Sequence, residues 1–250
     1  MLRRIALALV LGLAALSAAA ADARKYAVLS LIGDEMLVVG AQPATGQRLD
    51  RDSRNFLRLD DPIIDKTVLL AANQSLKGAT GADPVLLFAR ERPLYAMQQR
   101  LMNEGQGMVN LLGHIRPLVQ GSGATHLVLF TKARREARMQ LSDTALGTGM
   151  VEGVGFYVDP FTEIVIRDRQ QNATGFVAAF AYFDVALVDL GKGEVVGEQR
   201  VSGTRTMAAP NSVATEVWSG ISGADKMRML QGIIQQEVAR TLPALVKESN

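Results

Sequence analysis

Hydrophobic and polar residues alternate along this chain with two different periods, which predicts both strands and helices in one fold. Short apolar runs bounded by glycine or proline indicate strands in the first half of the chain, at residues 25–33, 36–40, 85–89 and 123–131. We expect the first two to pair as a hairpin that turns at Gly33 and Asp34, and 85–89 to be buried. Residues 41–61 are polar and predict a loop, with a short strand at 56–59.

Apolar residues at helical spacing predict three helices among these strands. The first begins at Pro62, with Asp61 as its N-cap, and stops at Gly78. The other two cover residues 93–104 and 108–119, on either side of a pair of glycines. Because helices and strands are mixed along this half of the chain, it favours an α/β or α+β fold.

The last third of the chain predicts a long hairpin followed by a terminal helix. Two apolar segments, 176–190 and 194–206, are joined by the glycine-containing tripeptide 191–193, which suits a compact hairpin loop. A helix follows near residues 225–246, with Asp225 as its expected cap. We therefore expect a single mixed sheet with an antiparallel C-terminal hairpin, flanked by helices that include a C-terminal helix.

A glycine-rich stretch at residues 142–175 interrupts this pattern. It predicts an irregular insertion in a single globular domain that spans residues 22–250. Within the stretch, Phe156, Tyr157 and Phe161 supply apolar side chains, which makes it a candidate loop for contact with a partner. A tightly turned loop without a binding role is the alternative.

The first 21 residues match a secretory signal peptide. Arg3 and Arg4 precede an uncharged apolar run that is shorter than a membrane span, and small residues follow, with cleavage frames that end at Ala21 and Ala23. Because no cysteine lies near these frames, we exclude a lipoprotein. We expect a periplasmic or secreted protein, with an uncleaved membrane anchor as the alternative.

Composition narrows the class of function. The chain has 27 basic and 25 acidic residues, and Arg3 and Arg4 account for the whole basic excess. The mature protein would therefore lack the positive charge that nucleic-acid binding requires. The absence of cysteine excludes disulfides, thiolate metal sites and cysteine nucleophiles. No other apolar run approaches about 18 residues, so we expect no transmembrane segment in the mature protein.

No recognisable motif for catalysis, a cofactor or a metal emerges. His114 and His126 lack the spacing of metal ligands, and the surroundings of Ser222 lack the final glycine of a nucleophile elbow. The glycine cluster at 147–153 lacks the third glycine of the dinucleotide-binding pattern. The basic run at 132–138 could bind anions, or it could be a solvated strand face.

Two stretches, residues 123–131 and 183–197, resemble periplasmic α/β domains. The second contains Leu-Val-Asp-Leu-Gly-Lys-Gly-Glu-Val-Val. It is similar to a hairpin in curli-secretion-type lipoproteins, in the amino-terminal domain of the Tol-system propeller protein and in outer-membrane activators of peptidoglycan synthases. The resemblance implies a mixed sheet closed by antiparallel strands and a non-enzymatic role in the envelope, and it implies no site residues.

These observations predict an exported, non-enzymatic adaptor or assembly factor of the cell envelope. It would contact an envelope protein partner through residues 142–175 or through an exposed sheet edge. Two alternatives stay open: a periplasmic hydrolase with an unrecognised site, and a small-ligand carrier with an apolar cavity between sheet and helices.

Overall fold

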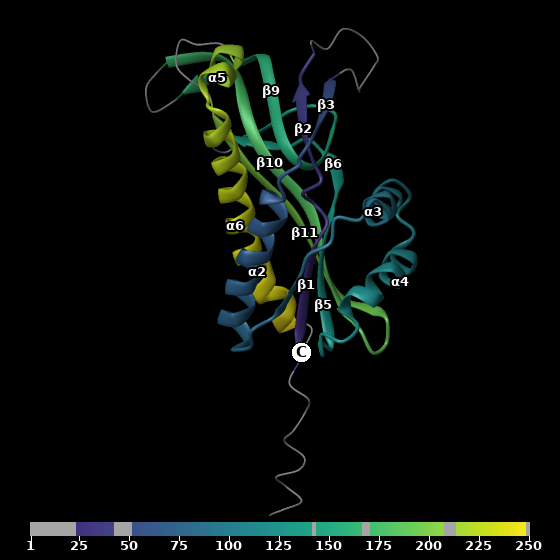
Figure 1. Ribbon diagram of the computed structural model, residues 1–250. Coiled ribbons are helices and arrows are strands. Elements are labelled where there is room, and N and C mark those ends of the chain that lie inside the picture. Colours follow the sequence, from purple (N-terminus) through teal and green to yellow (C-terminus); the bar gives the residue numbers. More distant parts are fainter. Residues whose placement is uncertain (1–23, 43–51, 142–143, 167–170, 208–213, 249–250) are drawn as a thin grey trace, which may run out of the picture.

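A computed structural model of the chain describes residues 24–42, 52–141, 144–166, 171–207 and 214–248. The predicted signal peptide lies outside the described residues. The fold is α/β, as the sequence predicts, with one large mixed sheet, helices on both of its faces and a long helix at the C-terminal end (Figure 1).

The longest strand, β10 (Gln171–Asp189), organises the sheet because it has neighbours along both of its edges. Strand β11 (Glu194–Met207) runs antiparallel along one edge. Two strands share the other edge: β9 (Met150–Ile166) pairs with the first part of β10, and β5 (His126–Lys132) pairs with the last part. The β10–β11 pair confirms the predicted antiparallel C-terminal hairpin.

Strands β5 and β9 each have their own further neighbours toward the far edge of the sheet. Strand β1 (Tyr26–Ser30) pairs parallel with β5, and β2 (Glu35–Gly40) pairs parallel with β9. The outermost strands are β4 (Val85–Leu87), parallel to β1, and β3 (Ser53–Arg58), antiparallel to β2. The sheet therefore has two halves that share β10 and β11. We call the junction between the halves, where β1 ends and β2 begins, the seam.

The predicted hairpin between residues 25–33 and 36–40 is therefore wrong. Strands β1 and β2 run in the same direction, and residues 31–34 lead from one to the other without reversing the chain. Every residue of β1 is buried, which suits an interior position between parallel neighbours. An apolar run of this kind indicates a strand but does not specify its partner.

Two long helices pack against each other on one face of the sheet (Figure 1). These are α2 (Ile63–Thr80) and α6 (Gly223–Glu248), with the short helix α5 (Ala214–Gly220) near the upper end of the same face. Their apolar side chains cover alternate residues of β10, including Val177, Phe183 and Val185. No helix in the described part of the chain is long and apolar enough to cross a membrane.

The opposite face is covered in two parts. Helices α3 (Arg92–Glu104) and α4 (Met108–Val119), both close to their predicted bounds, pack over β1 and β5. Strands β7 (Met139–Leu141) and β8 (Thr144–Leu146), which follow the short strand β6 (Arg134–Glu136), contribute to the cluster over β2 and β9. Both halves of the sheet therefore have an apolar core on each side.

Three predicted helix ends differ from the structure. Pro62, and not Asp61, occupies the N-cap position of α2, and no described side chain caps that end. The same helix ends at Gly81, in the left-handed conformation (φ 75°) that suits glycine, and not at Gly78. At the start of α6, the hydroxyl of Ser222 accepts a hydrogen bond from the backbone N–H of Asp225 (3.1 Å), so Ser222 is the cap.

The prediction of an irregular insertion at residues 142–175 is also wrong for most of the stretch, because β9 and the start of β10 occupy it. Close approach of two strands explains one of its glycines. A Cβ on Gly155 would lie 1.8 Å from the carbonyl oxygen of Leu37 in β2. Glycine within a strand commonly marks such an approach. At this position it indicates crowding and not a loop.

This approach gives the first testable prediction. We expect Gly155→Ala to lower the free energy of unfolding by about 3 kcal/mol or more, because the added methyl group collides with backbone that cannot move aside. The matched control is Gly232→Ala in α6, where an added Cβ meets nothing within 4 Å. The control should stabilise the fold by about 0.5–1 kcal/mol. Urea denaturation measures both, and a small effect at Gly155 would contradict the β2–β9 pairing.

Candidate functional site

A polar cleft of about 500 Å³ lies at the seam. The seam is at the carboxyl ends of the parallel strands β1 and β4, where open α/β sheets commonly bind ligands. Helices α2 and α3 both begin beside it. The cleft is lined by Asp34, Glu35, Phe56, Arg58, Leu59, Asp60, Arg90, Arg92 and Tyr95.

A buried glutamine bonds the backbone at the point where β1 ends. Gln98 of α3 donates a hydrogen bond from Nε2 to the carbonyl oxygen of Leu31 (2.8 Å). Its Oε1 accepts one from the backbone N–H of Lys132 at the end of β5 (2.9 Å). A single side chain thus provides hydrogen-bond partners for two backbone groups that lie where the strand pairing stops.

A buried aspartate accepts hydrogen bonds from the same segment between β1 and β2, from the other face of the sheet. Asp65, in the first turn of α2, accepts at Oδ1 hydrogen bonds from the Ser30 hydroxyl (2.6 Å) and from the Gly33 N–H (3.0 Å). Its Oδ2 is buried without a hydrogen-bond partner among the described residues. A Cβ on Gly33 would lie 2.7 Å from that oxygen, so only glycine fits above it.

The burial of Asp65 changes its acidity. Burial raises the pKa of its carboxyl group from 3.8 to about 6, the hydrogen bonds from Ser30 and Gly33 oppose this change, and the nearby Asp34 adds to it. Tyr95 of α3 is affected in turn, because burial and then the charge of Asp65 raise the pKa of its phenol group. Asp65 is not itself a lining residue of the cleft, but it changes the acidity of Tyr95, which is.

A buried lysine forms ion pairs with two of the acids that line the cleft, and its single positive charge balances one of them. The Nζ of Lys132 lies 2.6 Å from Oδ1 of Asp34 and 2.9 Å from Oε1 of Glu35, and only 3% of the lysine side chain is exposed. Its stem passes over Gly153, where a Cβ would approach the Lys132 side chain to 3.1 Å. The described ion pairs of Asp34 and Glu35 are with this ammonium group and not with the arginines of the cleft.

Three guanidinium groups of the cleft, those of Arg58, Arg90 and Arg92, form no ion pair with any other described residue. Arg90 donates hydrogen bonds to the backbone carbonyl oxygens of Leu59 and Asp60, which joins the end of β3 to the chain that follows β4. Arg58 and Arg92 are exposed. Among the described lining residues, Asp60 is the one carboxylate without an ion pair, so three guanidinium groups and one carboxylate of the lining have no ionic partner.

Exposed apolar side chains gather on the two outermost strands beside the cleft. Ten large hydrophobic residues are exposed in the described part of the chain, and five of them lie on β3, on β4 or directly after β4. Within the described residues, β3 and β4 each pair with a single strand. We call this region the outer edge, and its exposed apolar residues are Phe56, Leu57, Val85, Leu86 and Phe88. The predicted burial of residues 85–89 is therefore wrong for most of that strand.

The predicted partner-contact residues are mostly in the core. Phe156 is fully buried and packs edge-on against Trp218 of α5, with ring centroids 5.2 Å apart. Tyr157 is also fully buried, and its hydroxyl accepts a hydrogen bond from the N–H of Thr148 (3.0 Å). Because β9 is an interior strand with both faces covered, alternate residues enter opposite cores. Phe161 alone among the three is exposed.

The two histidines and the serine considered for catalysis lie on separate elements. His114 is exposed on α4, and its ring bonds the carbonyl of Asn110 one turn earlier. His126 is buried at the start of β5 beside the Thr125 hydroxyl (2.9 Å), and burial lowers the pKa of its imidazole. Ser222 caps α6, as described above. These contacts are structural and do not assemble a triad.

The arginines of the basic run at 132–138 pair with nearby carboxylates. Arg134 lies 3.8 Å from Glu152, and Arg138 lies 2.9 Å from Glu136. Arg135 contacts Asp184 and also donates to the carbonyl oxygen of Val201 (2.8 Å). This run therefore lacks the unpaired charge that distinguishes the arginines of the seam cleft.

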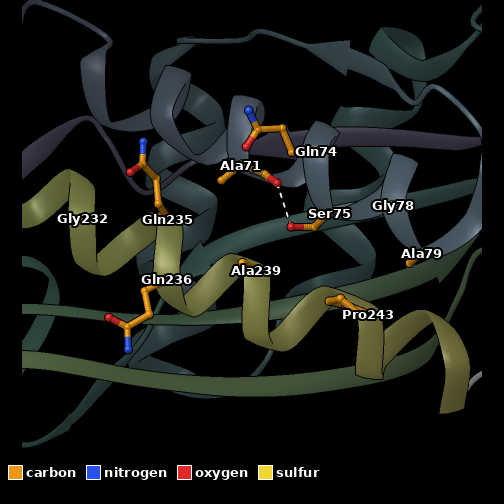
Figure 2. Close-up of a pocket in the computed structure, with 10 residues that line it drawn as sticks. All are labelled: Ala71, Gln74, Ser75, Gly78, Ala79, Gly232, Gln235, Gln236, Ala239 and Pro243. Atoms are coloured by element: carbon orange, nitrogen blue, oxygen red, sulfur yellow. Dashed lines mark hydrogen bonds between the residues drawn. The ribbon is translucent and has the colours of Figure 1, made fainter.

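A second concavity, of about 810 Å³, lies between α2 and α6 (Figure 2). None of its described lining residues is ionisable, and the Ser75 hydroxyl donates a hydrogen bond to the backbone carbonyl of Ala71 in its own helix. Small residues and glutamines therefore leave an open groove that indicates no particular ligand. Its lining comprises Ala71, Gln74, Ser75, Gly78, Ala79, Gly232, Gln235, Gln236, Ala239 and Pro243.

No protein-family model and no curated protein matches this sequence. The resemblance to periplasmic envelope domains therefore stays a prediction, and the seam cleft is interpreted from its own geometry.

Sequence reasoning missed the cleft, although one residue carried a usable signal. Asp65 falls among Ile64, Val68 and Ala72 on the apolar face of its helix, where a charged residue contradicts the pattern. The arginines offered a weaker signal, because Arg90 and Arg92 follow an apolar strand directly and precede a helix. Nothing in their spacing connects them to Arg58, which reaches the cleft through the pairing of β3 with β2.

The raised pKa of Asp65 gives the second prediction. Because the folded pKa exceeds the unfolded value, the folded state keeps the proton longer, and stability falls as the pH rises from 3.8 to about 6. Asp65→Asn removes this titration. Relative to the wild type, we expect this variant to gain roughly 3 kcal/mol between pH 3.5 and pH 7.

Urea denaturation across this pH range measures the difference in the free energy of unfolding between variant and wild type. Asp83→Asn, which removes an exposed carboxyl group paired with Lys77, is the matched control and should differ from the wild type by less than about 1 kcal/mol throughout. A constant difference for Asp65→Asn would show that its carboxyl group is not responsible for this dependence.

Proposed function

We propose that this protein is a non-enzymatic adaptor of the cell envelope, which is exported to the periplasm or beyond and binds a protein partner along its outer edge. The supporting observation is that half of the exposed large hydrophobic residues in the described chain lie on β3, on β4 or directly after β4, and that each of these strands pairs with a single strand among the described residues. Exposed apolar patches and unpaired strand edges are typical of interaction surfaces.

The outer edge replaces the 142–175 segment as the proposed contact surface. Phe156 and Tyr157 belong to the core, whereas Leu86 and Phe88 are exposed at the end of the sheet. Export is supported by the charged, apolar and small-residue segments before Ala21 and Ala23. The resemblance to periplasmic adaptor domains supports the same cellular role.

The raised pKa of Asp65 does not favour a hydrolase. A carboxyl group with this acidity could act as a general acid, and such groups concentrate at active sites. However, the Asp65 side chain is buried beneath Gly33, and its Oδ1 bonds the chain between β1 and β2. These contacts indicate that Asp65 is buried because it holds the chain at the seam by hydrogen bonds.

The third prediction tests the outer edge in cells. A photoreactive amino acid at Leu86 should crosslink the protein to one envelope partner, and Val85→Lys should reduce this crosslink by about tenfold, because lysine on an edge strand blocks strand pairing. The matched control is Val196→Lys in β11, since Val85 and Val196 are both 38% exposed. The control should leave the crosslink intact.

Two outcomes would contradict this function. One is the absence of any crosslink from position 86 when the protein is present at its normal level. The other is equal loss in the Val85→Lys and Val196→Lys variants, because a general effect on folding or export would then explain the result. Circular dichroism of both purified variants checks that each keeps the fold of the wild type.

A further inference from the structure

We propose that the segment bound at the outer edge is an extended acidic peptide, which adds as a strand beside β4 and places a carboxylate in the seam cleft. This inference rests on the proposed function and names the chemistry of the partner. It follows from the open edge of β4, the apolar residues on both sides of that strand, and the unpaired arginines at its end.

Strand β4 has the features of an acceptor for another strand. Its described pairing is with β1 alone, so the backbone groups of its opposite edge have no strand partner among the described residues. Successive side chains of a strand point to opposite faces, so Val85 and Leu86 lie on different sides of the sheet, and each is 38% exposed. An added strand would therefore find an apolar neighbour on each face while its backbone bonds β4.

The arginines of the cleft favour an acidic side chain on the added peptide strand. The chain passes from β4 to Arg90 and Arg92 within a few residues, and the end of β3 brings Arg58 to the same cleft. A guanidinium group presents two parallel N–H donors that match the two oxygens of a carboxylate. A peptide that follows β4 toward the cleft would meet these donors, so glutamate or aspartate suits that position.

The acids of the cleft leave two exposed arginines available. Asp34 and Glu35 form ion pairs with Lys132, whose single charge balances one of them, and neither Arg58 nor Arg92 has a carboxylate partner among the described residues. The apolar outer edge leads directly into the charged cleft, and this favours a peptide over a free small anion. A small anion would contact the arginines but not the apolar edge.

The fourth prediction uses synthetic peptides on the full mature protein. A nine-residue peptide of alternating valine and glutamate should bind, as measured by fluorescence anisotropy, about tenfold more tightly than its valine–glutamine counterpart. The double variant Arg58→Gln/Arg92→Gln should abolish this difference. The matched control Arg100→Gln/Arg116→Gln removes two exposed arginines from α3 and α4 and should retain it.

A second measurement tests strand addition directly. Two further valine–glutamate peptides carry N-methyl groups at every second residue, in opposite phases, so that each phase removes the donors along one edge of the peptide. We expect the phase that faces β4 to lose binding and the other to keep it. Equal affinity of the two phases would overturn strand addition.

The remaining outcomes separate this inference from the proposed function. If the glutamine peptide binds as tightly as the glutamate peptide, the acidic preference is wrong, whereas a crosslink sensitive to Val85→Lys would still support the adaptor. If glutarate binds as tightly as the glutamate peptide, the cleft is a small-anion site and the peptide is wrong. If Val85→Lys leaves the cellular crosslink unchanged, the proposed function fails whatever the peptides do.

Discussion

The structure depends on how the buried backbone groups between the end of β1 and the start of β2 find hydrogen-bond partners at the seam. Unpaired backbone groups in such a buried position would cost free energy comparable to lost hydrogen bonds. Gln98 bonds the end of β1 from the face that carries α3, and Asp65 bonds the following residues from the face that carries α2. Two helices, α2 through Asp65 and α3 through Gln98, are therefore bonded to the same point of the sheet.

The character of the cleft follows from this support. A carboxyl group buried beneath Gly33 is expensive to ionise, and the pKa of Asp65 rises accordingly. Lys132 forms ion pairs with Asp34 and Glu35 and balances one of their two charges, while the arginines brought by β3 and by the start of α3 have no carboxylate partner among the described residues. These arginines are therefore the groups of the cleft that an added carboxylate could meet.

Local patterns predicted much of the fold but not the pairing of its strands. The turn at 191–193, the strand near 123–131 and the terminal helix depend on neighbouring residues, and the structure confirms them. The β1–β2 hairpin failed because alternation reveals a strand and not its partner, and Gly155 was misleading because close strand approach and flexible loops both favour glycine. The cleft was unpredictable for the same reason, since Arg58 and Arg92 meet only through the pairing of distant strands.

The two open edges of the sheet are protected differently, and this bears on what the outer edge binds. Among its exposed residues β11 carries Glu194, Glu198 and Arg200, charges of the kind that discourage edge-to-edge pairing. Strand β4 contains no charge within its bounds and is protected by its shortness. In an antiparallel pair of two β4 strands, the arginines that follow each strand would lie at opposite ends of the pair, so their repulsion would not prevent it. Under the proposed binding mode, these arginines instead favour a partner with a carboxylate at the position that follows β4.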